Sequence, residues 1–286
     1  MERVTVVGAG VMGKGIAYAF AISNFQVVLN DIRLEALQKA EADINQLLND
    51  SFQKGFLSEV QYARAKENLQ YDMELASAVK DADLVVEAVI ERMDIKADVF
   101  QKLDKLCKSD AVLATNTSTM SPTEIGAQTS RPDKVVAMHF FNPVHKMKLI
   151  EIVRGLETSD ETVQFAKEVA TKLKKEYVEV NEFPGFITSR MNCLIGNEAM
   201  NMLMEGVASA KDIDKAIKLG LNHPMGPLAL ADFIGLDTCL SIMEVLHSGL
   251  GDSKYRPCPL LRKYVKAGWL GKKSGRGFYD YEEKTS

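Results

Sequence analysis

The 286-residue sequence has only four cysteines and four histidines, and it carries little net charge, −4 at pH 7. The cysteines are Cys107, Cys193, Cys239 and Cys258, and none are paired at the spacing of metal ligands. We therefore expect no metal site and four reduced thiols, buried as small apolar side chains in a cytoplasmic protein. The small negative charge argues against a broad face for nucleic acid.

Long apolar runs are also missing. No stretch approaches the roughly 20 apolar residues that cross a bilayer, so we expect no membrane anchor. The first apolar run begins by residue 3 and is short and glycine-rich, which predicts no secretory leader. The length suits one large domain or two ordinary ones. A hydrophobic content of 46% is enough for a core that needs no disulfides.

What the sequence does have is a glycine motif directly after its first strand. A β-branched run over residues 3–7 breaks into Gly8-Ala9-Gly10-Val11-Met12-Gly13, and an apolar, helix-favouring segment follows. In a strand–turn–helix unit Gly8 allows the turn, Gly10 lets a phosphate approach the backbone, and Gly13 lets the helix lie close to the strand. The N–H groups at the start of the helix would then face a pyrophosphate.

An acidic residue follows the second strand at the expected spacing. Residues 26–29 form that strand, and Asp31 lies eighteen residues after Gly13. A carboxylate there suits two ribose hydroxyls and repels a ribose phosphate, which predicts NAD rather than NADP. Arg33 lies close by and could contact a phosphate, which weakens this exclusion slightly. A glycine turn followed by a solvated Asp31 is the simpler alternative, and the order of strand, glycines, helix, strand and acid disfavours it.

Further strands and helices alternate up to residue 183. The expected strands cover 83–89, 111–115, 134–139, 149–153 and 177–180, and the expected helices cover 34–54, 94–107 and 162–174. This alternation predicts an α/β fold, a doubly wound (Rossmann), mostly parallel sheet. Beyond it only helix periodicity remains, with helices expected over 187–202, 210–219 and 228–246. We therefore predict a dinucleotide-binding domain over 1–183 and an all-α domain over 184–286, which could also supply a dimer interface.

A helical insertion relative to a minimal βαβ unit follows Asp31. The long helix over 34–54 ends near Gly55, and Ser58 is suited to cap a second helix that reaches Leu69. Lys54, Arg64 and Lys66 give this pair a basic side. These charges form either a solvated helix face or a contact for an anionic handle of a substrate, and the residues alone leave both open.

His139 and Glu151 are the first candidates for chemistry. His139 ends a strand that should point into the ligand crevice, and Glu151 is a carboxylate within the next, apolar strand. A histidine beside a carboxylate is a general base with a fixed tautomer, and oxidation of an alcohol needs such a base while hydride leaves for a nicotinamide. A hydrogen-bonded core histidine with an incidental glutamate is the equally open alternative.

Polar residues after neighbouring strands are further candidates. Glu87, Glu91 and the loop over 116–119 follow strands of the sheet and should lie near the nicotinamide end of the crevice. Ser118 and Asn142 are on crevice loops within reach of a substrate oxygen. On spacing alone they are better explained as turn residues.

Together these residues resemble the 3-hydroxyacyl-CoA dehydrogenase family, and within it the short bacterial 3-hydroxybutyryl-CoA dehydrogenases. The resemblance covers essentially the whole chain. Its most specific stretch is His139-Phe140-Phe141-Asn142-Pro143-Val144. The other matching stretches are 8–13, 86–91, 116–118, Glu151, 184–186, 223–227 and 275–279.

The resemblance implies a reversible, NAD-dependent oxidation of (S)-3-hydroxyacyl-CoA to 3-ketoacyl-CoA, as in fatty acid and butyrate metabolism. It implies that His139 is the general base with Glu151 as its partner, and that Ser118 and Asn142 hydrogen-bond the reacting oxygens. It further implies a homodimer joined through the helical domain, with the substrate in the interdomain cleft and Lys54 near the coenzyme A. The implied NAD contacts are Gly8, Gly10, Val11, Met12, Gly13, Asp31, Glu91, Lys96, Asn116 and Ser118.

One position departs from the family's pattern. Many relatives have an asparagine before Arg190 that reaches the active site. This sequence has Ser189 there, which is shorter but could still donate a hydrogen bond, directly or through water.

Two other functions stay open. One is a dehydrogenase of free hydroxy acids or sugar acids on the same fold, and the other is an NAD-binding protein without catalysis.

Overall fold

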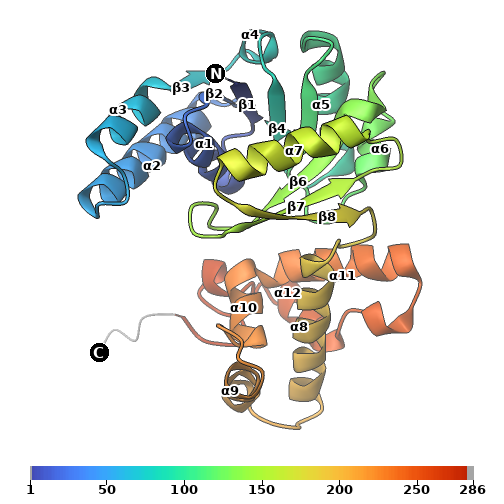
Figure 1. Ribbon diagram of the computed structural model, residues 1–286. Coiled ribbons are helices and arrows are strands. Elements are labelled where there is room, and N and C mark those ends of the chain that lie inside the picture. Colours follow the sequence, from blue (N-terminus) through green and yellow to red (C-terminus); the bar gives the residue numbers. More distant parts are fainter. Residues whose placement is uncertain (1, 282–286) are drawn as a thin grey trace. The chain divides into compact units, whose positions relative to one another are not determined.

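The computed structural model describes residues 2–281 and divides between Glu182 and Phe183 into two compact units, each described here by itself (Figure 1). The first unit contains one eight-stranded sheet of order β3-β2-β1-β4-β5-β6-β7-β8. Its strands are β1 (Arg3–Val7), β2 (Gln26–Asn30), β3 (Leu69–Asp72), β4 (Leu84–Glu87), β5 (Val112–Thr115), β6 (Val135–Phe140), β7 (Leu149–Arg154) and β8 (Glu176–Asn181).

All neighbouring strands of this sheet are parallel except β6 and β7, which are antiparallel. The chain runs outward from β1 to β3 and then returns to β4 on the other side of β1. Loops after β1 and β4 therefore diverge at this switch point and open a crevice at the carboxyl ends of the strands. The predicted doubly wound, mostly parallel sheet is confirmed.

Helices cover both faces of the sheet because the strands have apolar side chains on both faces. The helices are α1 (Val11–Ile22), α2 (Leu34–Gln53), α3 (Glu59–Glu67), α4 (Leu75–Val79), α5 (Met93–Leu106), α6 (Pro122–Gly126) and α7 (Asp160–Lys172). Val4, Val6 and Val86 pack with α1, α2 and α7, whereas Val7 and Val85 pack with α4, α5 and α6.

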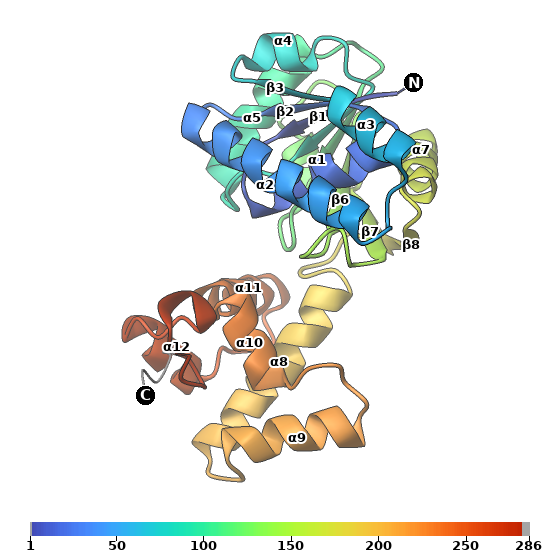
Figure 2. The same cartoon turned by 90° about the vertical axis from the view of Figure 1, so that its left-hand side faces the viewer.

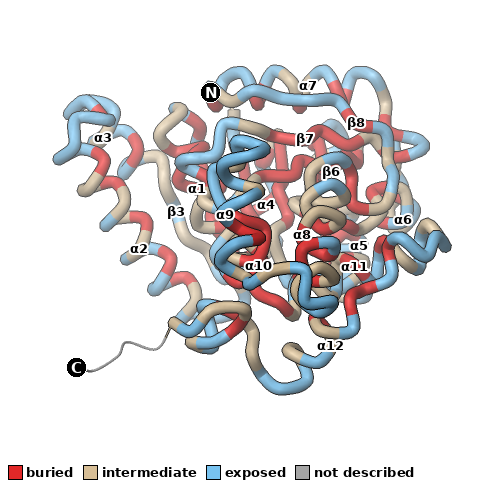
Figure 3. The backbone as a smooth tube through the Cα atoms, turned by 90° about the horizontal axis from the view of Figure 1, so that it is seen from below, coloured by how far each residue is buried: buried red, intermediate tan, exposed pale blue. Residues whose placement is uncertain are grey.

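Helices α2 and α3 run beside each other (Figures 1 and 2) and form the crossover from β2 to the edge strand β3. Buried and exposed positions alternate along α2 (Figure 3), because Leu37, Ala40, Ile44 and Leu48 recur at helical spacing. Ser58 caps α3 as expected, but Leu69 begins β3 instead of continuing the helix. The strand β3 and the short helix α4 were not predicted, since neither has apolar residues at a clear strand or helix spacing.

The second unit is all-helical. Its helices are α8 (Thr188–Met204), α9 (Ala210–Gly220), α10 (Pro227–Ile234), α11 (Leu236–Leu250) and α12 (Pro259–Lys266). The single helix expected over 228–246 is wrong, because the chain breaks at Gly235 between α10 and α11. Gly235 has a φ of 106°, a backbone conformation that residues with a side chain rarely adopt.

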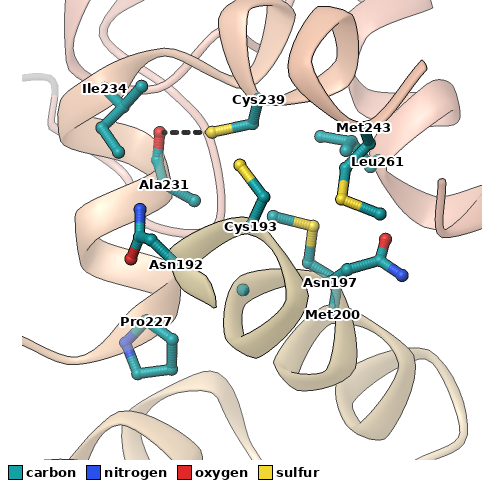
Figure 4. A pocket seen from close by; sticks show the side chains of 11 residues that line it. Asn192, Cys193, Asn197, Met200, Pro227, Ala231, Ile234, Cys239, Met243 and Leu261 are labelled. Carbon is teal, nitrogen blue, oxygen red and sulfur yellow. Dashed lines mark hydrogen bonds between the residues drawn. The ribbon is translucent and has the colours of Figure 1, made fainter. Parts of the chain in front are cut away.

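The core of the second unit contains three of the cysteines, Cys193, Cys239 and Cys258. Cys193 on α8 and Cys239 on α11 line a small cavity of about 10 Å³, and the Cys239 thiol faces the Ala231 carbonyl at 3.9 Å (Figure 4). Burial raises the pKa of the Cys193 thiol to about 12. All four cysteines are buried and unpaired, as the sequence predicts. Among residues 2–281, no helix combines the length and the apolar character needed to cross a bilayer.

Candidate active site

The glycine loop between β1 and α1 has no room for side chains at two of its three glycines. Gly8 has a φ of 105°, and a Cβ there would lie 2.6 Å from the Ala88 carbonyl oxygen. A Cβ on Gly13 would lie 1.7 Å from the Gly8 carbonyl oxygen, so the turn and the helix touch directly. Within residues 2–281, a Cβ on Gly10 would meet nothing within 4 Å. The middle glycine therefore faces open space, where a phosphate could approach the backbone.

The start of α1 suits an anion. No side chain caps the helix at Gly10, and its first turn contains no acidic residue. The N–H groups of Val11, Met12 and Gly13 are in the first turn of α1, where backbone N–H groups have no acceptor within the helix. The helix dipole adds positive potential at the same end. These features fit a pyrophosphate group.

Asp31 follows the end of β2 and lies against the glycine loop. Its carboxylate accepts hydrogen bonds from the Ala9 N–H at 2.9 Å and the Arg33 N–H at 3.0 Å. The exposed Arg33 side chain approaches the same carboxylate, with Nε 3.6 Å from Oδ1. A carboxylate fixed at this point favours a dinucleotide whose ribose keeps both hydroxyls, which is NAD.

His139 and Glu151 are cross-strand partners because β7 runs antiparallel to β6. The His139 Nδ1 lies 2.7 Å from the Glu151 Oε2, His139 is 7% exposed and Glu151 is completely buried. A carboxylate accepts hydrogen bonds, so this contact favours the tautomer with the proton on Nδ1 and the lone pair on Nε2. Spacing alone could not give the strand direction that makes this contact.

The loop that carries Asn142 is fixed from two sides. The Lys175 ammonium donates to the Val144 carbonyl at 2.7 Å and to the Met147 carbonyl at 2.6 Å. On the other side, Val144 packs against α1, where a Cβ on Gly15 would lie 3.0 Å from its side chain. Asn142 thereby lines a cavity of about 140 Å³ together with residues of α1 and α2, among them Val11, Lys14 and Leu47.

Glu91 and Ser118 meet where the loops after β4 and β5 come together. The Glu91 Oε1 accepts from the Thr117 hydroxyl, from the Ser118 N–H at 2.9 Å and from the Ser118 hydroxyl at 3.3 Å. Burial by itself would raise the pKa of Glu91, but the Lys96 ammonium and these hydrogen bonds outweigh it, and the pKa lies below its ordinary value. Glu91 is therefore ionised at neutral pH.

Lys96 and Asn116 lie in the same region, with their side chains already engaged. Lys96 is fully buried, and its ammonium is 2.7 Å from Glu87 and 3.1 Å from Glu91. The Asn116 Oδ1 accepts the Phe140 N–H at 2.9 Å, which ties the loop after β5 to the end of β6. The pairing of Lys96 with Glu87 was not predicted, although Lys96 shares the buried face of α5 with Phe100 and Leu103.

The two remaining candidates are on other elements. Lys54 follows the last residue of α2 and is exposed at the tip of the α2–α3 pair. Ser189 is in the first turn of α8, in the second unit, and is half-buried.

Comparison with known proteins gives matches along the whole chain. The family model "3-hydroxyacyl-CoA dehydrogenase, NAD binding domain" matches residues 3–183, and "3-hydroxyacyl-CoA dehydrogenase, C-terminal domain" matches residues 185–281. A probable 3-hydroxybutyryl-CoA dehydrogenase of Bacillus subtilis is 53% identical over 100% of this chain and 99% of its own length. A 3-hydroxybutyryl-CoA dehydrogenase of Bradyrhizobium diazoefficiens is 47% identical over 98% of this chain and 96% of its own.

A solved structure is similarly close. The crystal structure of (S)-3-hydroxybutyryl-CoA dehydrogenase from Ralstonia eutropha superimposes with a TM-score of 0.95 at 43% identity, and the match covers 99% of this chain and 100% of that one. The glycine loop, the Asp31 carboxylate and these matches agree. The chain belongs to the 3-hydroxyacyl-CoA dehydrogenase family and is an NAD-dependent enzyme of that family.

Proposed function

We propose that the protein interconverts short-chain (S)-3-hydroxyacyl-CoA and 3-ketoacyl-CoA, with 3-hydroxybutyryl-CoA as its main substrate. The observation that carries the proposal is the buried His139–Glu151 pair. This pair lies on strands of the same sheet as β1, the strand that leads into the glycine loop. The names of the Bacillus and Ralstonia relatives support the short acyl chain.

His139 is the general base in this proposal. Its Nε2 takes the proton of the C3 hydroxyl, and the Glu151 carboxylate stabilises the imidazolium that results. When bound, NAD supplies the acceptor for the hydride that leaves C3. Ser118 and Asn142 hold the reacting oxygens by hydrogen bonds, so that the hydroxyl proton points toward His139.

The same proposal assigns the cofactor contacts. The glycine loop with Val11 and Met12 binds the pyrophosphate, and Asp31 binds the adenosine ribose. Glu91, together with Lys96 and Asn116 in the same region, would hold the nicotinamide end of the cofactor. The support is the open space at Gly10 and the fixed carboxylates of Asp31 and Glu91.

Lys54 and the cavity beside Asn142 support a coenzyme A ester rather than a free acid. The cavity is bounded by α1, α2 and the loop after β6, and it offers room beside the reacting centre. The exposed ammonium of Lys54 can pair with a phosphate of coenzyme A. Ser189 of the second unit is the remaining acyl contact in the proposal.

We also propose that residues 1–183 hold the cofactor and that residues 184–286 mediate homodimerisation. The second unit has a groove of about 520 Å³ between α8, the end of α9 and residues 253–259, where apolar side chains such as Leu194 and Met202 lie beside polar ones such as Glu198 and Arg256. Leu221, beside this groove, is 62% exposed.

We place the protein in the cytoplasm, because its unpaired thiols suit a reducing compartment.

The homodimer is tested by molar mass from light scattering. Leu221→Asp should weaken the dimer at least tenfold, because a carboxylate would be buried at the interface. Leu156→Asp is the matched control, since Leu156 is 85% exposed and lies in the first unit. A wild-type monomer, or equal effects of both changes, would contradict the proposed interface.

Steady-state kinetics test the proposed reaction. NADH oxidation is measured with acetoacetyl-CoA and with free acetoacetate, and NADPH replaces NADH in a second series. We expect kcat/KM to be at least about 100-fold higher for the coenzyme A ester and for NADH. A preference for free acids would favour the hydroxy-acid alternative, and NADH binding without turnover on any substrate would favour the non-catalytic one.

A further inference from the structure

A closed turn between β6 and β7 follows Asn142 directly. The Pro143 carbonyl accepts from the Lys146 N–H at 3.0 Å and from the Met147 N–H at 3.1 Å, so residues 143–147 form one turn. Asn142 is exposed and lies between this turn and the end of β6. The position of the Asn142 side chain therefore depends on what holds the turn.

One side of the turn packs on α1. Val144 is 3% exposed, and a Cβ on Gly15 would lie 3.0 Å from its side chain. The His145 ring meets the Tyr18 ring edge-on, with 6.2 Å between the ring centroids. Both contacts fix the turn relative to the helix that begins in the glycine loop.

The other side of the turn is held by Lys175. Its ammonium donates to the Val144 carbonyl at 2.7 Å and to the Met147 carbonyl at 2.6 Å. These carbonyls belong to a turn outside the helices and strands, so the ammonium satisfies acceptors in the way that a lysine satisfies the last carbonyls of a helix.

The backbone of Lys175 is itself fixed at the corner between α7 and β8. Lys174 has a φ of 55°, which reverses the chain after α7, and the Lys175 N–H donates to the Ala170 carbonyl at 3.0 Å. The next residue, Glu176, begins β8 and pairs with Leu149 of β7. The side chain of Lys175 thus reaches the turn from a rigid support.

The surroundings of Lys175 differ from those of an ordinary surface lysine. Lys175 is half-buried, and burial lowers the pKa of its ammonium. Within residues 2–281 no carboxylate forms an ion pair with it, whereas Lys172 nearby pairs with Glu2 at 2.6 Å. A cation that is partly removed from water is costly unless polar groups compensate it, and here two backbone carbonyls do so.

We propose that Lys175 is a positioning residue for the reaction, because it holds the 143–147 turn and thereby fixes Asn142 where it can bind a reacting oxygen of the acyl substrate. Lys175 acts through Asn142 and touches neither substrate nor cofactor. The inference rests on the proposed function, which assigns Asn142 to that oxygen. A displacement of about 1 Å in such a group can cost up to about 100-fold in rate.

The kinetics of Lys175→Met test this role. Methionine keeps much of the length of the side chain and removes its donors, so the turn is released on one side. We expect kcat with acetoacetyl-CoA and NADH to fall roughly tenfold. The Kd for NADH should stay within about twofold of wild type, because Asn142 is assigned to the acyl substrate. Lys175→Arg keeps the charge and the donors and should restore kcat to within about threefold of wild type.

Lys174→Met is the matched control. It removes the same charge from the neighbouring, exposed position and should leave kcat unchanged. A double-mutant cycle adds the link to Asn142. The variant Lys175→Met/Asn142→Ala should have a kcat within about twofold of Asn142→Ala alone, because residues that act through one another are not additive.

Amide hydrogen exchange tests the turn without any substrate. The Lys146 and Met147 amides, which bond to the Pro143 carbonyl, should exchange at least about tenfold faster in Lys175→Met than in wild type or Lys174→Met. Where Lys175→Met does not fold, Lys175→Gln, which keeps a polar head but has a shorter reach, replaces it in every measurement.

Two results would overturn the inference. A wild-type kcat in Lys175→Met, with a lower Tm, would mean a purely structural role. Losses from Lys175→Met and Asn142→Ala that multiply in full would mean that Lys175 acts independently of Asn142. A wild-type protein that binds NADH but does not reduce acetoacetyl-CoA would refute the proposed function instead, and hydrogen exchange would still decide whether Lys175 holds the turn.

Discussion

The two units use their buried carboxylates differently. In the first unit, Glu151 is hydrogen-bonded to the His139 ring, and Glu87 to the Lys96 ammonium and the Thr115 hydroxyl. Their principal partners are side chains with chemistry of their own. These carboxylates therefore set the orientation of groups at the carboxyl ends of the strands.

In the second unit the buried carboxylates bind the backbone. Asp214 accepts the N–H groups of Leu228 and Ala229 at the start of α10. Asp232 accepts the N–H groups of Phe278 and Tyr279 at 2.9 Å each. Each carboxylate ties backbone amides of another segment to its own helix, so it fixes the path of the chain.

This difference gives two glycines of the second unit a structural role. A Cβ on Gly226 would lie 2.2 Å from the Asp214 carboxyl carbon, and a Cβ on Gly277 would lie 2.0 Å from an Asp232 oxygen. The glycines of these two motifs let the backbone close over a carboxylate. The motifs of the second unit thus encode the fold, whereas His139 and Asn142 in the first encode the proposed chemistry.

The largest expected effect is on catalysis in the first unit. His139→Gln should lower kcat with acetoacetyl-CoA and NADH by about 10²–10⁴-fold, because the general base is lost while the fold remains. Circular dichroism and the Kd for NADH should stay close to wild type. Turnover near that of wild type would show that His139 is not the base.

The second expected effect is on stability in the second unit. Asp232→Asn replaces an oxygen acceptor by an amide that faces backbone N–H groups and should cost about 2–4 kcal/mol of the free energy of unfolding. Burial raises the pKa of Asp232, although the bonds from Phe278, Tyr279 and Tyr281 oppose it. We expect a Tm lower by about 5–10 °C. An unchanged Tm would mean that the carboxylate does not hold the chain there.

A smaller effect concerns the pH dependence of stability through Glu91. Its folded pKa is lowered below the unfolded value of about 4.3, so it contributes stability above that pH, and this contribution is lost as the pH falls through the folded pKa. Glu91→Gln should therefore lower the Tm at pH 7, and its difference from wild type should shrink near pH 3.5. A difference that does not change between these two pH values would contradict the ionised, paired state of Glu91.

The smallest effect is expected at Ser189. Ser189→Asn restores the residue that many relatives have, and we expect kcat with acetoacetyl-CoA to change by less than about threefold, because both side chains can donate a hydrogen bond. A loss comparable to that of His139→Gln would show that the acyl pocket is built around a serine.

The glycine loop, the alternation of strands and helices and the cap at Ser58 could be predicted because each depends on local patterns. The break at Gly235 could not, since a glycine within an apolar helical period is compatible with a continuous helix. The edge strand β3 could not be predicted either, because its residues do not alternate between apolar and polar. Three of its four residues are only half-buried and the other is exposed.

The candidate site shows the same division. His139 and Glu151 could be singled out as an unusual pair, but their contact depends on β7 running antiparallel to its neighbour. The role of Lys96 could not be deduced from its position alone. A lysine on the apolar face of α5 is explained only by the carboxylates that the strand order brings to it.

The most direct test of the difference between the units is to measure kcat and Tm side by side for Glu151→Gln and Asp232→Asn. Glu151→Gln should lower kcat by about 10²-fold and change the Tm by less than about 3 °C, since glutamine can still accept from the His139 ring. Asp232→Asn should lower the Tm by at least about 5 °C and leave kcat, assayed well below that Tm, within about threefold of wild type. If instead Asp232→Asn lost turnover while Glu151→Gln lost only stability, the assignment of chemistry to one unit and of structure to the other would be wrong.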